Sequence, residues 1–225
     1  MPVFQLTDAL NFPPISLAEP DGLLAVGGDL SPERLLLAYR LGIFPWYSEH
    51  TPILWWSPDP RLVLFPGELK VSKSLLRVIG KSVFTVTFDR AFAEVVKRCA
   101  EVRRKRGEGT WIVPEMVDAY LRLHGLGYAH SVESWHQGEL VGGLYGVILG
   151  KIFYGESMFT QKTDASKVAF VHLVERLRRL DFHLIDCQVA TGHLIRFGAR
   201  EIPRHEFLRI LAGALEGIRA SGRPV

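Results

Sequence analysis

The chain has 225 residues, of which 48% are hydrophobic and 23% are charged, a composition typical of a globular protein with a full core. Its formal net charge of +3 is too small to establish nucleic-acid binding, so local clusters of charge have to decide that question. The two cysteines, Cys99 and Cys187, predict neither a disulfide framework nor a paired metal site. No apolar run reaches the ~20 residues of a membrane helix and no secretion signal is recognisable, so we expect a cytoplasmic protein.

The first sixty residues are rich in proline, glycine and tryptophan and predict a small irregular subdomain over residues 1–60. One helix is well marked there, because Ser31 is placed to cap it, Pro32 suits its first position and Gly42 is placed to end it. The segment 27–29 before this helix lacks the full pattern of a phosphate-binding loop, so an ordinary turn is favoured.

Residues 61–225 predict a mixed α/β domain. Three consecutive strand-like runs, separated by turn signals at Gln137-Gly138 and at Gly150, indicate an antiparallel meander. A meander, one crossing helix and another strand is the order of an acyltransferase-type sheet, so we expect an α/β (α+β) fold. The expected elements are a strand over 83–88, helices over 89–100 and 114–124, strands over 129–135, 139–149 and 151–158, a helix over 164–180, a strand over 183–189 and a helix over 205–218.

One acidic residue interrupts the last strand of the meander. Gly155, Glu156 and Ser157 stand between the apolar runs 152–154 and 158–159. A carboxylate in this place would be partly desolvated, so it would either pair with a positive group or have a raised pKa, and a substrate amine would be a natural partner. A glutamate on the solvated face of an edge strand explains the pattern equally well.

The next predicted strand contains two polar residues that are separated by one position. Because strand side chains alternate between faces, Asp186 and Gln188 are expected on one face and Ile185, Cys187 and Val189 on the other. A carboxylate beside an amide is able to fix its orientation by hydrogen bonding. Taken alone, the pattern slightly favours a solvent-facing strand edge.

Five tryptophans are present, and an indole ring is able to stack on a nucleic-acid base. Most tryptophans belong to a core or an interface, which is the commoner interpretation. Trp46 and Trp111, each in a loop-like segment, are the best candidates for stacking.

Two clusters of basic residues are candidates for contact with phosphates. Lys73, Arg77 and Lys81 are spaced four residues apart, which places them in one stripe of a short helix. Ser72 is a suitable cap for that helix. A second cluster, over residues 103–106, is expected in a loop. Runs of charge are usually solvated surface, which is the alternative for both clusters.

Several uncommon motifs resemble the leucyl/phenylalanyl-tRNA-protein transferase family, in order and over nearly the whole chain. They are Gly22–Pro32, Gly42–Trp46, Trp55–Arg61, Gly109–Ile112, His130–Glu133, Gly155–Phe159, Ala165–Lys167 and Ile185–Val189. The resemblance implies that residues 61–225 form an acetyltransferase-like catalytic domain. It also implies transfer of leucine or phenylalanine from aminoacyl-tRNA to proteins that begin with arginine or lysine, which marks them for degradation, and a monomeric enzyme.

The resemblance further implies roles for particular residues. Those expected near the terminal adenosine are Trp46 and Trp111, those along the acceptor stem are Lys73, Arg77 and Lys81, and those around the reacting centre are Glu156, Asp186 and Gln188.

The implied reaction requires no metal, cofactor or covalent nucleophile, because the aminoacyl ester is activated and the acceptor amine has a pKa of ~8. The histidines form no HExxH pair, so no metal site is expected. Our hypothesis is that Asp186 orients Gln188, that the pair holds or deprotonates the attacking amine, and that Glu156 fixes an amino group by charge. As an alternative, a sugar hydroxyl of the tRNA shuttles the proton while the protein aligns the reactants.

The expected amino-acid pocket departs from the family pattern, which has a leucine followed by two phenylalanines on the long helix. Here Phe170, Leu173 and Leu177 occupy those positions, on one helical face. We therefore expect a pocket of altered shape, which does not rank leucine against phenylalanine or methionine. Its other expected lining residues are Leu144, Phe153, Gly155, Ser157, Met158 and Ile185.

Two other functions were considered. An acetyl-CoA-dependent N-acetyltransferase needs a glycine-rich turn at a helix N-terminus for the pyrophosphate, and residues 159–164 contain no glycine. A non-catalytic RNA-binding module is supported by the basic clusters and the tryptophans, but it leaves the polar residues of the two strands unexplained.

Overall fold

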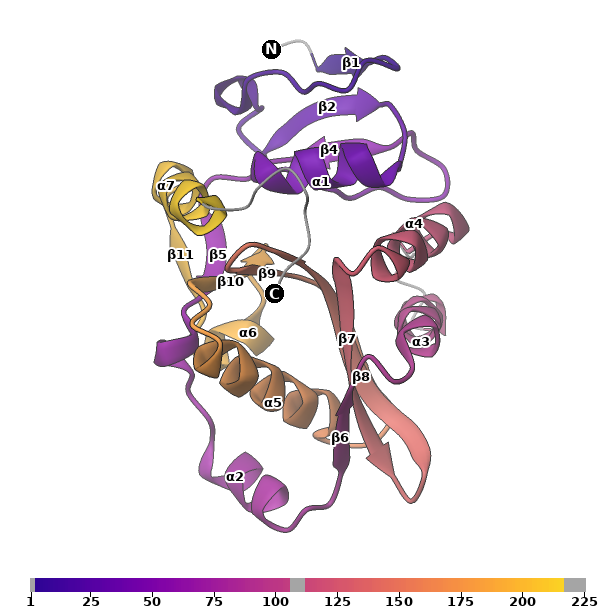
Figure 1. Cartoon of the computed structure of the whole chain (residues 1–225), viewed down its shortest axis with the longest axis vertical. Helices are drawn as coiled ribbons and strands as arrows, with labels where there is room; N and C mark the ends of the chain where they lie inside the picture. The colour runs from indigo at the N-terminus through magenta and orange to yellow at the C-terminus, as the bar shows by residue number, and fades with distance from the viewer. Residues whose placement is uncertain (1–2, 106–111, 217–225) are drawn as a thin grey trace.

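The computed structural model describes residues 3–105 and 112–216, which form two sheets surrounded by helices (Figure 1). The N-terminal sheet has the strand order β1-β2-β4-β3 and packs beside helix α1. Its elements are β1 (Phe4–Leu6), β2 (Leu23–Gly27), α1 (Pro32–Arg40), β3 (Phe44–Pro45) and β4 (Leu54–Trp56), with the short 3-10 helix η1 (Ile15–Leu17) between β1 and β2. The sequence analysis did not predict these strands. Strands of two to five residues are too short to show an alternating pattern.

Helix α1 begins and ends as its sequence predicts. The Ser31 hydroxyl accepts a hydrogen bond from the backbone N–H of Arg34 at 3.3 Å, and Pro32 is the first helical residue. Gly42 follows the helix with a φ of 73°, in the left-handed region that favours glycine. The turn before the helix is an ordinary one, because the Asp29 carboxylate is bound by the Ser31 N–H and by the Arg34 side chain.

The larger sheet has seven strands in the order β11-β5-β10-β9-β8-β7-β6. The meander is confirmed, since β7, β8 and β9 pair antiparallel to one another. The crossing helix is confirmed too, because β10 pairs parallel to β9 after α5. The bounds are β5 (Arg61–Leu64), β6 (Thr85–Phe88), β7 (Ala129–His136), β8 (Glu139–Leu149), β9 (Ile152–Thr160), β10 (Leu184–Gln188) and β11 (Arg200–Ile202).

Helices cover both faces of the larger sheet: α3 and α4 lie on one side and α5 on the other (Figure 1). The strand residues alternate accordingly, since Leu144 packs in the apolar cluster of α5 and Tyr145 in that of α3 and α4. Helix α3 continues to Lys105, so residues 103–105 of the second basic cluster are helical and the predicted loop was wrong there. The bounds are η2 (Pro66–Glu68), α2 (Lys73–Gly80), α3 (Phe92–Lys105), α4 (Pro114–Gly125), α5 (Ala165–Arg179), α6 (Gly192–Arg196) and α7 (Arg204–Leu215).

The two sheets share one apolar core. Tyr39 of α1 is fully buried against Tyr154 of β9, with ring centroids 4.8 Å apart, and the Tyr154 hydroxyl donates to the Tyr39 carbonyl at 2.9 Å. The change from one sheet to the other falls between Trp56 and Arg61, and a domain boundary at residue 60 stays a prediction. Within residues 3–105 and 112–216, no helix is long and apolar enough to cross a membrane.

Candidate active site

The site lies where the neighbouring strands β9 and β10 separate. Their parallel pairing ends at Tyr154 and Asp186, and the residues that follow on each strand diverge. Both strands also contain a β-bulge. Glu156 is the extra residue of β9 opposite β8, and Cys187 is the extra residue of β10 opposite β5. Bulges redirect side chains and are common beside active sites, so the local sequence places this polar group at an opening in the sheet.

A cavity of about 990 Å³ opens between the separated strands and is bounded by α5 and α6. Most residues of the predicted pocket lie together around this cavity. The predicted residues that line it are Trp46, Leu144, Phe153, Gly155, Glu156, Ser157, Met158, Phe170, Leu173, Ile185 and Gln188. Leu177 is buried in the adjoining apolar cluster but does not line the cavity, so its predicted place in the wall was wrong. Trp111 lies outside the described residues.

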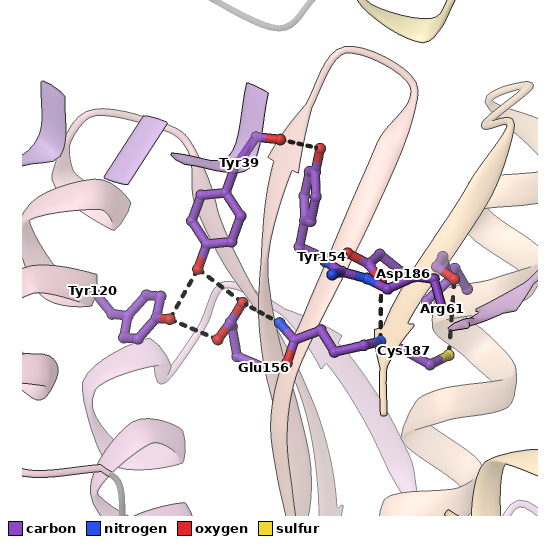
Figure 2. A network of polar contacts seen from close by, with 9 residues as sticks. Tyr39, Arg61, Tyr120, Tyr154, Glu156, Asp186 and Cys187 are labelled. Carbon is purple, nitrogen blue, oxygen red and sulfur yellow. Dashed lines mark hydrogen bonds and ion pairs between the residues drawn. The ribbon is translucent and has the colours of Figure 1, made fainter. Parts of the chain in front are cut away.

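Glu156 is buried, with 8% of its surface exposed, in a group of polar side chains (Figure 2). The Tyr39 hydroxyl donates to its Oε1 at 2.8 Å and the Tyr120 hydroxyl donates to its Oε2 at 2.6 Å. Gln188 Nε2 donates to Oε1 at 3.2 Å. Burial raises the pKa of Glu156 to about 7, although these hydrogen bonds act to lower it. The solvated edge-strand alternative was therefore wrong.

Asp186 is fully buried and forms a bidentate ion pair with Arg61 of β5. Arg61 Nε donates to Oδ1 at 2.8 Å and Nη2 donates to Oδ2 at 2.7 Å. The guanidinium lies between two rings, 4.7 Å from the centroid of Phe44 and 4.8 Å from that of Phe207. A solvent-facing strand edge is thus excluded for Asp186, and its carboxylate serves to fix the chain rather than to line the cavity.

Gln188 connects the two carboxylates. Its backbone N–H donates to Asp186 Oδ1 at 2.9 Å, while its side chain donates to Glu156. Its φ of 64° is left-handed, a conformation that costs energy in a residue other than glycine. Asp186 thus contacts Gln188 at its backbone, and its role in orienting Gln188 stays a prediction. The predicted link between the two side chains, based on strict alternation, was wrong because the bulge at Cys187 interrupts the strand.

Comparison with known proteins places the chain in one family. The family model described as leucyl/phenylalanyl-tRNA protein transferase matches residues 63–212, and the model of its N-terminal domain matches residues 28–59. The chain belongs to the leucyl/phenylalanyl-tRNA-protein transferase family. The resemblance carried by the sequence motifs is thereby confirmed.

Several curated relatives bear the name leucyl/phenylalanyl-tRNA–protein transferase. The relative from Syntrophobacter fumaroxidans is 76% identical, over 94% of this chain and 91% of that protein. The relative from Anaeromyxobacter sp. (strain Fw109-5) is 64% identical, over 99% of this chain and 95% of that protein. Among solved structures, that of L-PGS from Bacillus licheniformis has a TM-score of 0.44 at 11% identity, covering 88% of this chain and 72% of that chain, which supports no statement about fold or reaction.

Four residues of this transferase-family site were not found from the sequence: Tyr39, Arg61, Tyr120 and His193. Tyr39 and Tyr120 lie at buried positions of amphipathic helices, where they are indistinguishable from core residues. Arg61 closes the family motif Trp55–Arg61, which was a usable signal. His193 belongs to the five-residue helix α6 and has no periodic signal.

Two cavity-lining side chains have unpaired polar atoms. Ser157 Oγ and His193 Nε2 are both buried and have no hydrogen-bond partner among the described residues. Burial, together with the charges of Lys167 and Arg196, lowers the pKa of His193, so its ring is neutral near pH 7. Unpaired buried groups of this kind are suited to bind polar atoms of a substrate of this family.

The basic stripe is separate from the cavity. Lys73 and Arg77 are exposed on α2, and Lys81 is the residue that follows the end of the helix at Gly80. The Ser72 hydroxyl caps α2 by accepting from the Leu75 N–H at 3.2 Å, as predicted. The stripe is thus accessible to a large ligand of the transferase family, at a distance from the reacting groups.

Possible metal ligands and the one cysteine of the site were considered next. Residues 3–105 and 112–216 contain no group of three or more His, Cys, Asp or Glu side chains that is arranged to hold a metal ion. Burial and the charge of Asp186 raise the pKa of the Cys187 thiol far above its usual range, so it is not a thiolate nucleophile.

Proposed function

We propose that the protein transfers leucine, phenylalanine or methionine from aminoacyl-tRNA to the α-amine of proteins that begin with arginine or lysine. The product is a peptide bond that marks the acceptor for degradation. The observation that carries this proposal is a buried series of hydrogen-bonded residues at the opening between β9 and β10, directly beside an apolar cavity. The series runs from Glu156 through Gln188 and Asp186 to Arg61.

The chemistry of the reaction fits a site made of these groups. The aminoacyl ester is already activated, and the acceptor amine needs only to lose a proton and to be held against the carbonyl carbon. A buried carboxylate and an amide that is fixed at its backbone are able to orient such an amine. No cofactor is required for any step.

The apolar part of the cavity fits the side chain of the transferred residue. Phe153, Met158 and Phe170 line it together with Leu144, Leu173 and Ile185. The Phe170 ring packs on Phe197 with centroids 4.9 Å apart, which fixes the shape of this wall. An apolar slot discriminates against a residue smaller by one methylene by only ~1–3 kcal/mol, so we expect related side chains such as leucine and methionine to share it.

The tRNA is proposed to lie across the cavity mouth and to reach α2. Trp46 is 42% exposed, lines the cavity and is held from behind by Trp56, whose Nε1 donates to the Trp46 carbonyl at 2.7 Å. A half-exposed, anchored ring is suited to stack on the terminal base. The exposed stripe of Lys73, Arg77 and Lys81 would bind phosphates of the acceptor stem, and Trp111 keeps its predicted role beside the terminal adenosine.

Working on aminoacyl-tRNA implies that the protein acts in the cytoplasm, and we propose that it acts as a monomer. A transfer assay tests the function. Labelled leucyl-tRNA, phenylalanyl-tRNA or acetyl-CoA is incubated with peptides that are identical except for an N-terminal arginine, lysine or alanine. We expect aminoacyl label on the arginine and lysine peptides alone. Acetyl label on the peptide would establish the N-acetyltransferase alternative, and tRNA binding without transfer would establish the RNA-binding module.

A further inference from the structure

Tyr39, Tyr120 and Glu156 form a closed triangle of oxygen atoms, which we call the tyrosine–glutamate triangle (Figure 2). The two hydroxyl oxygens are 2.9 Å apart, and each lies within hydrogen-bond distance of a different carboxyl oxygen, at 2.8 Å and 2.6 Å. All three residues are buried. The three groups come from α1, α4 and β9, so only the assembled core brings them together.

The number of protons in the triangle depends on the state of Glu156. Three oxygen–oxygen contacts need three protons to be hydrogen bonds. With an ionised carboxylate, only the two phenol protons are present, and both are donated to Glu156, which leaves the contact between the hydroxyls without a proton. With a neutral carboxyl group, Oε2 donates to Tyr120, Tyr120 to Tyr39, and Tyr39 to Oε1, so every contact is filled.

The contact of Gln188 is consistent with this order of donors and acceptors in the triangle. Its Nε2 donates to Oε1, the oxygen that remains an acceptor when Oε2 carries the proton. The triangle is therefore complete with one additional proton, and it is built to accept that proton.

The surroundings of the triangle supply negative rather than positive partners. In addition to burial, Asp186 of β10 raises the pKa of Glu156. Tyr145 of β8 likewise raises the pKa of Tyr39 and Tyr120, again in addition to burial. Arg61 is held by Asp186. Among the described residues, no lysine, arginine or histidine forms an ion pair with Glu156. The pKa of Glu156, at about 7, lies close to the ~8 of an acceptor α-amine.

We propose that the tyrosine–glutamate triangle is the proton acceptor of the transfer reaction, with Glu156 as the base and Tyr39 and Tyr120 as positioning residues that share the proton. This rests on the proposed function. Glu156 is one of the residues that line the cavity, which is the side from which an incoming α-ammonium group would approach it. The role of Glu156 thus changes from a fixed binding charge to a group that alternates between two protonation states.

The step balances as follows. The α-ammonium of the acceptor gives one proton to the ionised Glu156, and the third hydrogen bond of the triangle forms. The free amine attacks the ester carbonyl carbon, so that the C–N bond forms and the bond from carbon to the tRNA oxygen breaks. The second amine proton passes to the leaving ribose oxygen. Glu156 later releases its proton to solvent.

The protonation state is measurable without any activity. Infrared difference spectra between the wild type and Glu156→Gln are recorded through a pH titration. We expect the carbonyl band of a protonated carboxylic acid in the wild type that is absent from Glu156→Gln and titrates near pH 7. In Tyr39→Phe and Tyr120→Phe the titration should move to higher pH, because the hydrogen bond that each variant removes from the ionised carboxylate is charge-assisted and stronger than a neutral contact of the protonated ring. A carboxylate that stays ionised to about pH 5 overturns the proposal.

Single-turnover transfer rates provide a second test of the proposal. In the wild type the rate should rise with pH to a plateau, and in Tyr39→Phe and Tyr120→Phe this rise should shift to higher pH. The titration of the peptide amine is common to all variants and cancels in the comparison. Tyr128→Phe is the matched control, because it removes the hydroxyl of a partly buried tyrosine that packs on the same core and is not part of the triangle, and its profile should coincide with the wild type.

Glu156→Gln should lower the single-turnover rate by about 10²–10⁴-fold. A Glu156→Gln protein that transfers at the wild-type rate overturns the proposal and leaves the proposed function intact. A wild type that titrates as expected but transfers no aminoacyl group overturns the proposed function instead.

Discussion

Two buried carboxylates lie on neighbouring strands of this site, and the protein treats them in opposite ways. Asp186 is opposed by the Arg61 guanidinium in a bidentate ion pair. Glu156 has no cationic partner among the described residues and is surrounded by two phenols and an amide. Burial disfavours a charged carboxylate, and this cost is offset either by a cation or by binding a proton. Asp186 is therefore paired with a cation, whereas Glu156 is able to bind a proton.

The two environments also divide the work of the site. The Asp186–Arg61 pair holds the backbone of Gln188 in a left-handed conformation, and Gln188 in turn contacts Glu156. The ion pair thus controls the geometry of Gln188, and Glu156 is available for proton transfer. Variants of Arg61 and Asp186 remove the ion pair, and Glu156→Gln removes the group that binds a proton.

Breaking the ion pair should have the largest effect. Arg61→Met leaves the Asp186 carboxylate buried without a cation, which should lower the free energy of unfolding by about 3–5 kcal/mol. It should also lower the single-turnover transfer rate at least about 10²-fold, since a small misplacement of a positioned group has that effect. Urea unfolding and a quenched transfer assay measure the two quantities.

The double variant Arg61→Met/Asp186→Leu separates stability from function. Replacing both charges by apolar side chains should restore most of the unfolding free energy, because no unpaired charge remains. The transfer rate should stay low, since the Gln188 N–H has lost its acceptor. Recovery of both quantities would show that Asp186 does not position Gln188.

Glu156→Gln should change how stability depends on pH. The pKa of Glu156 is about 7 in the folded protein against an ordinary 4.5, so between these values the folded state binds more protons than the unfolded state. Stability from this group is therefore lost as pH rises from about 4.5 to about 7, by about 3 kcal/mol in total. Relative to the wild type, Glu156→Gln should become more stable over this window. A constant difference between the two proteins at pH 5 and at pH 8 would refute this assignment.

Two leucines on α5 allow a matched test of the apolar side of the site. Leu173 lines the cavity, whereas Leu177, one turn further along, is equally buried but does not. Leu173→Ala and Leu177→Ala should each lower the unfolding free energy by about 2–5 kcal/mol. Leu173→Ala alone should alter the ratio of leucine to phenylalanine transfer, by roughly 10-fold. An equal change of selectivity in both variants would mean that general loosening of α5, rather than the cavity wall, sets the preference.

The exposed basic residues of α2 contrast with the buried ion pair. Replacing them should have the smallest effect on the stability of the fold. Replacing Lys73, Arg77 and Lys81 by glutamine should change the free energy of unfolding by less than about 0.5 kcal/mol. Affinity for tRNA should fall and its dependence on salt should become less steep, because phosphate contacts release counterions. Binding measured at two salt concentrations tests this. Arg122→Gln with Arg209→Gln, exposed cations on α4 and α7, is the control that should leave both quantities unchanged.

The fold was predictable where elements are long. Helix α5 was expected over 164–180 and spans Ala165–Arg179, and the three strands of the meander lie within two residues of the predicted bounds. The four strands of the N-terminal sheet were missed. Short strands are stabilised by pairing partners that are distant in sequence, such as Phe4 with Ala25, so their own residues carry little signal.

The site was predictable for residues that interrupt an apolar strand, and only for those. Glu156, Asp186 and Gln188 were selected because polar groups at such positions need partners. The partners themselves were not, since Tyr39 is 117 residues away from Glu156 in sequence and Arg61 is 125 residues away from Asp186. The bulges at Glu156 and Cys187 depend on the neighbouring strands, so strict alternation gave the wrong direction for Gln188.

The sequence by itself determined the family, the mixed α/β class and the two strand segments that hold the polar residues, because motifs and hydrophobic periodicity are local properties of the chain. Only the tertiary structure decided which carboxylate is paired with a cation and which is surrounded by phenols. That decision depends on β5, α1 and α4 packing against β9 and β10, and burial makes the energy of a charge depend on its few nearest neighbours.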